Sequence, residues 1–490
     1  MFSTIWPAKS PIINTQARLK SNSVGLAGAV IMSAAIMGPA VSTFFNPQFS
    51  TPFSGPATPF VYFACLIAIL ITASGIMEMA AETPSAGSFY TYVAQGLGPH
   101  AGFVTGGLMF LAYALLPPIE VALIGAYLQQ TIQQEFGINI PWCLISIIPW
   151  GFMTFLALEG VQSSLRTAMV LFVIEVAVVL TMAIIVVAMG GAHGLTVRPL
   201  SPAASPHGVQ GLIIGAVFAA LSFVGFEGAT TLGEEVRNPR RNVPLAIALS
   251  TIAVGVLYTF CIWAEVVGLG VDKVAALTGA STPWNDLAHM YAPWLTPFII
   301  LASVSSMFAV SVNSNTGIVR ILYTMGREGL LPRALAYINP KHNTPSNAVL
   351  FQSGFTFLSV LIVGALSGGL GNPTGGSNVY GYLGFLLTLA ILVVYVFANI
   401  AAIAYFMKRR SGRVVRHILL PALGCVLMIG LFAGQIVENT GAPYTWMPWI
   451  TLAWFAVLVL GAIWLAVTRP ETLRKAGAVL GSEESVKLGG

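Results

Sequence analysis

Long apolar segments alternate with short polar connections along almost the whole chain. Apolar runs of roughly 18 or more residues are long enough to cross a bilayer as helices. Because backbone groups in lipid must be bonded internally, these runs predict an all-α polytopic membrane protein with twelve transmembrane helices. The predicted spans are 24–45, 59–80, 101–128, 141–159, 167–190, 209–232, 244–270, 293–319, 346–366, 379–405, 415–437 and 447–468.

Composition supports this class, since 56 % of the 490 residues are hydrophobic, only 8 % are charged and the mean hydropathy is +0.83. A soluble domain carries about 25 % charged residues. Residues 1–23 are polar and have no apolar core, so we expect the first span to act as an uncleaved insertion signal. We predict one membrane domain over 24–468, between an N-terminal tail at 1–23 and a polar C-terminal tail at 469–490.

The basic residues are distributed unevenly between the two sides of the predicted membrane domain. Of the 22 Lys and Arg residues, the predicted spans place only Arg198 and Lys273 in loops on one side. Basic residues accumulate in cytoplasmic loops. We therefore expect a multi-pass protein of the plasma membrane, with both termini cytoplasmic. This distribution also explains the net charge of +5 without a nucleic-acid partner.

Several other classes of protein lack the residues that they would need. No Gly-Lys-Ser/Thr phosphate loop is present, so an ATP-driven pump is not expected. The six histidines are scattered without metal spacing, which disfavours a metal site or a membrane enzyme. We expect no cofactor, and the sequence leaves the oligomeric state open. All four cysteines fall inside apolar runs and are expected to be buried without disulfides: Cys65, Cys143, Cys261 and Cys425.

The span 209–232 contains an ionisable residue within an apolar, glycine-rich stretch that runs from Phe223 through Glu227 to Gly228. A charged group at membrane depth is costly and usually faces a cavity or a partner. Broken helices near the bilayer middle are typical of secondary transporters. The alternative is a structural helix, kinked by glycine, whose glutamate reaches an interface.

A second interrupted helix suggests an internal duplication. The span 24–45 is interrupted at Gly38 and Pro39, and the span 209–232 is interrupted at Gly225 and Gly228. The two spans enter the membrane from opposite sides. Any repeat of five spans would therefore be inverted, and the paired breaks indicate a binding site.

The residues around these breaks carry a family resemblance. The stretch 223–227, followed by 234–240 and by Val243-Pro244, resembles the sixth-helix signature of amino acid–polyamine–organocation (APC) superfamily permeases. Residues 84–92 resemble the family's loop between helices 2 and 3. Residues 320–332, with Thr344-Pro345 beyond them, resemble the loop after helix 8. The matches occur in the family's order and cover roughly 24–468.

The resemblance implies a LeuT-like 5+5 inverted repeat with broken helices 1 and 6 and two additional C-terminal helices. The repeats would cover about 24–190 and 209–405, with the additional helices at 415–468. It also implies a secondary active transporter for amino acids or related amines that works by alternating access. The substrate would bind between the unwound parts of helices 1 and 6, at Ile36, Met37, Gly38, Pro39, Ala40, Phe223, Val224, Gly225, Phe226 and Glu227.

The chemistry of a helix break fits such substrates. A break frees backbone amides, which can hold a carboxylate, and carbonyls, which can hold an ammonium group. Many family members have a Gly-x-Gly pattern at the first break, whereas this chain has Gly38-Pro39-Ala40. Pro39 has no N–H. One donor for a substrate carboxylate is therefore missing, which makes the expected carboxylate-bearing substrate less secure and strengthens the case for an amine, so a polyamine or ethanolamine-type permease or exchanger stays open.

The second departure lies in the fifth span, where some proton-coupled members carry a lysine and this chain has Glu175. Burial disfavours the ionised form of a carboxyl group, so Glu175 is a candidate proton carrier. The alternative is a structural glutamate that bonds to a neighbouring helix. Glu120, which follows two prolines in the third span, is a further candidate. Glu265 is expected at the outer interface, and Glu78 and Glu82 at the cytoplasmic end of span 59–80.

The acids at membrane depth indicate the sign of the transported charge. The spans contain Glu120, Glu175 and Glu227 at membrane depth but no lysine. Three such acids without basic partners cannot all stay ionised, so we predict proton-coupled symport with Glu175 and Glu227 as the first candidates. Sodium coupling is the alternative, with hydroxyls from the eighth span: Ser303, Ser305, Ser306 and Ser311. A channel or an amine-sensing receptor stays open as a different class.

Overall fold

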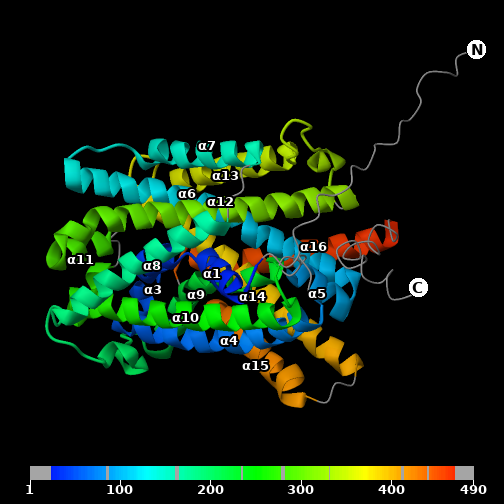
Figure 1. The fold of residues 1–490 in the computed structure, drawn as a ribbon, viewed down its shortest axis with the longest axis horizontal. Coiled ribbons are helices and arrows are strands. Elements are labelled where there is room, and N and C mark those ends of the chain that lie inside the picture. Colours follow the sequence, from blue (N-terminus) through cyan, green and yellow to red (C-terminus); the bar gives the residue numbers. More distant parts are fainter. Residues whose placement is uncertain are drawn as a thin grey trace, which may run out of the picture.

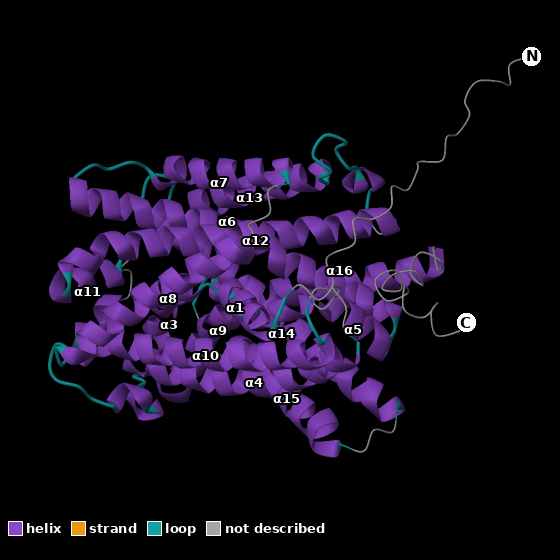
Figure 2. Cartoon of the chain, viewed as in Figure 1, coloured by secondary structure: helices purple, strands orange, loops and turns teal. Residues whose placement is uncertain are grey.

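The computed structural model describes residues 24–83, 88–160, 165–232, 236–277, 282–329, 331–409, 413–438 and 441–468. This part of the chain is helical and contains two isolated β-bridges but no strand (Figure 2). The α-helices are α1 Leu26–Ile36, α2 Pro39–Phe44, α3 Asn46–Ser54, α4 Thr58–Glu82, α5 Ser88–Leu97, α6 Pro99–Phe136, α7 Trp142–Glu159, α8 Leu165–Ala188, α9 Gly208–Phe223, α10 Pro239–Leu269, α11 Pro283–Tyr291, α12 Thr296–Glu328, α13 Ser346–Ser367, α14 Pro373–Lys408, α15 Leu420–Val437 and α16 Met447–Thr468; the 3₁₀ segment that follows α9 is η4, Phe226–Leu232.

Most of the long helices run side by side along the long axis of the molecule (Figure 1). Helix α6 lies inside the bundle, since 83 % of its apolar 18-residue segment is buried. In the spans that contain α7 and α16, only 22 % of the corresponding segment is buried. Their outward side chains, such as Ile148 at 74 % and Val467 at 78 % exposure, are apolar. A helix with an exposed apolar face fits a lipid environment.

Eleven helical stretches in the described part are long and apolar enough to cross a membrane. The first of them, Pro39–Glu82, joins α2, α3 and α4 over 44 residues, and only the shorter apolar helix Leu26–Ile36 precedes it. The predicted first span, 24–45, is therefore divided between α1 and α2. The structure has the helices of a polytopic membrane protein, and the count of twelve crossings stays a prediction.

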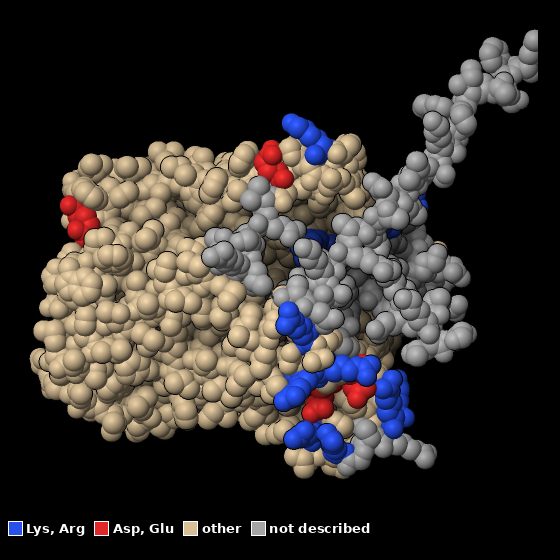
Figure 3. Space-filling model, in the orientation of Figure 1, with Lys and Arg blue, Asp and Glu red and all other residues tan. Residues whose placement is uncertain are grey.

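The two ends of the bundle differ in their charged side chains. The Lys and Arg side chains seen in Figure 3 lie toward one end. At that end the guanidinium of Arg409, after α14, lies 3.2 Å from the carboxylate of Glu82 at the end of α4. Lys408 donates to the backbone oxygen of Gly96 at 3.2 Å. Lys408 and Arg409, which the sequence predicts on the basic side of the membrane, therefore lie where α4, α5 and α14 end.

Close helix contacts depend on glycine at particular positions. A Cβ at Gly96 in α5 would lie 2.4 Å from the backbone oxygen and 2.7 Å from the Cα of Ala401 in α14. Backbone atoms inside a packed bundle cannot easily move away. By contrast, a Cβ at Gly354 in α13 would meet nothing within 4 Å.

We therefore expect Gly96→Ala to destabilise the bundle by about 1–3 kcal/mol, because it forces two helix backbones apart. The matched change Gly354→Ala should be neutral, or should stabilise α13 by up to about 1 kcal/mol through helix propensity. Thermal unfolding of the purified variants in detergent measures both effects. Equal melting temperatures for the two variants would contradict the close packing of α5 on α14.

Candidate functional site

The first helix break lies between α1 and α2. Helix α1 ends at Ile36, Met37 caps it, and Gly38 adopts the left-handed backbone conformation at φ 56° and ψ 73°. Glycine adopts this conformation without a steric penalty. Pro39 then occupies the first position of α2, where its fixed φ suits a helix start and its missing N–H costs no helical hydrogen bond. The break falls where the sequence predicts it.

The second break lies between α9 and η4. Helix α9 ends at Phe223, and Val224 is extended at ψ 126°. Gly225 has a φ of 106°, which strongly favours glycine. The chain then continues from Phe226 as the 3₁₀ segment η4. This break also falls where the sequence predicts it.

The two breaks pack directly against each other. A Cβ at Gly225 would lie 2.6 Å from Cγ2 of Ile36, and a Cβ at Gly228 would lie 2.5 Å from Cδ1 of the same isoleucine. The Ser33 hydroxyl in α1 donates to the backbone oxygen of Phe226 at 2.6 Å. The two predicted substrate-binding segments are therefore in contact, as a shared site requires.

A tyrosine on a third helix joins the last turns that precede both breaks. The Tyr258 hydroxyl, from α10, lies 2.9 Å from the backbone oxygen of Met37 and 3.2 Å from that of Ser222. Its side chain is fully buried. The Ser42 hydroxyl also donates to Met37, at 2.8 Å. Carbonyls near the ends of α1 and α9 are therefore bonded to side chains where water is excluded.

Glu175 lies at the first break. Its side chain, on α8, is 4 % exposed and faces the Ser306 hydroxyl and the backbone N–H of Ala40. The next amide, Val41 N–H, donates to the Ser306 hydroxyl oxygen at 3.3 Å. The candidate coupling residue and the start of α2 are thus in one cluster.

Glu227 lies at the second break and is 2 % exposed. One carboxylate oxygen accepts from the Tyr113 hydroxyl of α6 at 2.5 Å. The other lies 3.2 Å from the backbone N–H of Gly225 and 3.4 Å from the Tyr395 hydroxyl of α14. This carboxylate therefore connects η4 with two further helices. Together, the two breaks offer buried carboxylates, hydroxyls and carbonyls, which can hold a proton or a cation.

The other predicted acids occupy different places. Glu120 on α6 is 2 % exposed, and none of the hydrogen bonds or ion pairs between described residues joins it to either break. Glu78 and Glu82 lie at the basic end of the bundle, 3.3 Å from His417 and 3.2 Å from Arg409. No group of three or more potential metal ligands occurs within the described ranges.

Glu265 lies near the end of α10, and its place at the outer interface of the membrane stays a prediction. Its side chain is fully buried at 0 % exposure, and its carboxyl group faces the indole of Trp284. Helix α11 packs on α10 and α12 and brings Trp284, itself 2 % exposed, into the interior. Hydropathy along one helix cannot reveal such a cover from a short neighbouring helix.

Of the four serines predicted on the eighth span, only Ser306 reaches the break. Ser305 and Ser311 donate to carbonyls one turn back in their own helix. Sequence reasoning missed Tyr113, Tyr258 and Tyr395. Each is one aromatic residue among many in apolar spans, and nothing in the local sequence separates a bonding hydroxyl from a packing ring.

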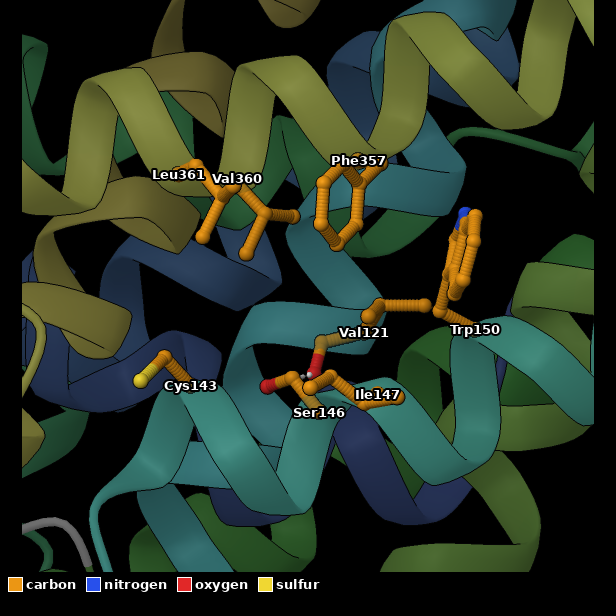
Figure 4. Close-up of a pocket in the computed structure, with 8 residues that line it drawn as sticks. All are labelled: Val121, Cys143, Ser146, Ile147, Trp150, Phe357, Val360 and Leu361. Carbon is orange, nitrogen blue, oxygen red and sulfur yellow. Dashed lines mark hydrogen bonds between the residues drawn. The ribbon is translucent and has the colours of Figure 1, made fainter.

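A separate crevice lies away from the breaks, between α6, α7 and α13. Its lining is mostly apolar and shares no residue with either break (Figure 4). The lining residues are Val121, Cys143, Ser146, Ile147, Trp150, Phe357, Val360 and Leu361. The Ser146 hydroxyl is already bonded to the backbone oxygen of Val121 at 3.0 Å. This crevice therefore adds no candidate chemistry.

Comparisons with known proteins show the family of the chain. The sequence model of the family described as "Amino acid permease" matches residues 24–471. The chain is 25 % identical over 420 residues to the low-affinity putrescine importer PlaP of Escherichia coli, covering 84 % of each protein. It is 23 % identical over 426 residues to the branched-chain amino acid permease BcaP of Bacillus subtilis, covering 83 % of this chain and 84 % of that protein. It is 26 % identical over 328 residues to cationic amino acid transporter 7 of Arabidopsis thaliana, covering 63 % of this chain and 55 % of that protein.

We expect Tyr258→Phe to lower the stability of the folded protein by about 1–3 kcal/mol, because it removes the hydroxyl that bonds the buried carbonyl of Ser222, whereas the carbonyl of Met37 keeps the Ser42 hydroxyl. The matched change Tyr337→Phe, at a side chain that is 52 % exposed, should stay within about 0.5 kcal/mol of the wild type. Thermal unfolding in detergent measures the difference. A Tyr258→Phe variant as stable as the control would contradict the bridging role.

Proposed function

Because the chain belongs to the amino acid permease family, we propose that it is a secondary active transporter of amino acids or related amines that works by proton-coupled symport and alternating access. The family and the relatives are permeases, so the protein is a membrane transporter rather than an enzyme. One observation carries the proposal: two broken helices meet inside the bundle, each with a buried carboxylate beside it.

The proposed architecture has twelve membrane helices, with α1 and α2 together forming the first. Five helices at about 24–190 and five at about 209–405 form two inverted repeats, and 415–468 adds two more. The corresponding breaks between α1 and α2 and between α9 and η4 support this arrangement, because paired broken helices are typical of inverted-repeat transporters.

The proposed location is the plasma membrane, with the basic end of the bundle and both tails, 1–23 and 469–490, in the cytoplasm. The basic residues around α14 and α15 and the start of α10 support this orientation. The opposite end carries the partly exposed pair of Glu135 and His289, 2.8 Å apart.

The proposed substrate site comprises 36–40 and 223–227, with main-chain groups as principal contacts. Phe223 and Phe226 are both fully buried there, where they can enclose a ligand or contact its cation. The proposed coupling groups are Glu175 first, Glu227 second and Glu120 third. None of the ion pairs between described residues includes these acids, so a proton, or a sodium ion, is the counter-charge that a buried carboxylate needs.

The alternative substrate class is an amine, as for a polyamine or ethanolamine-type permease or an exchanger. The similarity to a putrescine importer over 84 % of this chain supports it. A channel or an amine-sensing receptor is distinguished by uptake into liposomes, because a carrier gives slow, saturable uptake.

We expect Gly225→Leu to abolish substrate uptake while the protein still inserts into the membrane. Leucine cannot adopt the backbone conformation at φ 106° without strain, and its side chain would collide with Ile36. The measurement is uptake of a labelled substrate into proteoliposomes, with the amount of inserted protein determined in parallel.

The control is Gly430→Leu on α15, where a Cβ would meet nothing within 4 Å, and this variant should retain uptake. Normal transport by the Gly225→Leu variant would exclude the second break from the substrate site.

We expect uptake by the wild type to rise with an inward proton gradient and to fall when a proton ionophore is added. Glu175→Gln preserves the size of the side chain but cannot bind a proton. It should therefore lose gradient-driven uptake by about 10²-fold or more, which is the lower end of the range that positioned proton-transfer groups contribute in catalysis. Glu135→Gln, at a partly exposed pair far from the breaks, should respond to the gradient as the wild type does.

The opposite result is uptake that ignores the proton gradient but requires sodium. That outcome would contradict proton coupling and would assign the ion site to Ser306 and the carbonyls at the first break.

A further inference from the structure

Resting on the proposed function, we infer that the substrate is an amine without an α-carboxylate, and that the site discriminates against free amino acids. Residues of the chain itself, including one carboxylate at each break, already engage amides that a substrate carboxylate could otherwise bind. While these acids are ionised, before a coupling proton binds, a substrate carboxylate therefore meets negative charge at places where a broken helix would otherwise offer positive charge.

At the first break, every backbone position from Gly38 to Val41 is accounted for. The N–H of Gly38 donates to the backbone oxygen of Ala35 at 3.2 Å. Pro39 has no N–H. The N–H of Ala40 faces the Glu175 carboxylate, and that of Val41 donates to Ser306 at 3.3 Å. At the start of α2, a ligand therefore meets the Glu175 carboxyl group from α8 rather than a row of free amides.

At the second break, a carboxylate of the chain likewise engages a freed amide. The N–H of Gly225 points at Oε2 of Glu227, 3.2 Å away. The N–H of Gly228 donates to the backbone oxygen of Gly225 at 2.8 Å. The carboxylate group that faces this break is therefore the protein's own, and a second carboxylate brought by a substrate would repel it in a site that excludes water.

The same groups suit a substrate ammonium group. The Glu227 carboxylate supplies a buried negative charge with two hydroxyl groups beside it, from Tyr113 and Tyr395. The rings of Phe226 and Tyr395 lie 5.2 Å apart at this carboxylate, and aromatic faces attract cations. An ammonium group can therefore be bound by charge and by ring faces, with no need for an anion site.

The test compares amines with the amino acids that differ from them only by the α-carboxylate. The pairs are ethanolamine and serine, putrescine and ornithine, cadaverine and lysine, and isoamylamine and leucine. Binding to the purified full-length protein is measured by thermal stabilisation, since a ligand raises the melting temperature by mass action. Uptake of the same compounds into proteoliposomes is measured in parallel.

In every pair that binds, we expect the amine to act at a concentration at least about tenfold lower than the amino acid, which corresponds to 1.4 kcal/mol. An amino acid that binds as tightly as its amine, and is taken up, would overturn this inference and leave the proposed transporter function in place. If none of the eight compounds binds or is taken up, both the proposed function and this inference fail.

A substitution then tests whether Glu175 causes the preference for amines over amino acids. Glu175→Gln removes the negative charge that faces Ala40, so the ratio between amine and amino acid should fall by about tenfold in the binding assay. The control Glu135→Gln should keep the wild-type ratio. An unchanged ratio in Glu175→Gln would overturn the role given to this residue. The comparison in the wild type decides the substrate class even where that substitution prevents folding.

Discussion

A helix that is interrupted inside a membrane must have its freed backbone groups bonded within the protein, since lipid offers no hydrogen bonds. The structure meets this constraint with side chains from other helices. Tyr258 from α10 bonds the carbonyl of Met37, Ser33 from α1 bonds that of Phe226, and Ser306 from α12 bonds the amide of Val41. The buried polar residues around the breaks follow from this requirement, and the surrounding apolar helices keep water from replacing them.

The two broken helices also depend on each other away from the site. The N–H of Arg237, after η4, donates to the backbone oxygen of Val24, just before α1, at 2.9 Å. Together with the contact of Ile36 with Gly225, this bond joins the two segments at two levels. A movement of α1 that leaves η4 in place would break both contacts. Helix α1 and the segment that contains η4 are therefore held together at two places in this conformation.

The sequence predicts the parts of this arrangement that depend on local conformation. Glycine and proline have unusual backbone preferences, so Gly38, Pro39 and Gly225 are enough to locate the two breaks along the chain. The hydroxyl partners could not be predicted in the same way. Tyr113 and Glu227 are 114 residues apart in the chain, and only the packing of the helices brings them within bonding distance. The full burial of Glu265 could not be predicted for the same reason, because it depends on the short helix α11, which comes later in the chain and packs on α10.

Carboxyl groups at the breaks do more than bond the backbone. Hydroxyl or amide side chains could bond the freed backbone groups equally well and would stay neutral throughout a transport cycle. A carboxyl group is different, because protonation removes its negative charge and turns one acceptor oxygen into a donor. Glu175 and Glu227 each face an amide at a break. Under the proposed coupling, a proton that binds either acid therefore weakens the contact that holds the local backbone, so that proton occupancy and helix geometry shift each other's equilibrium.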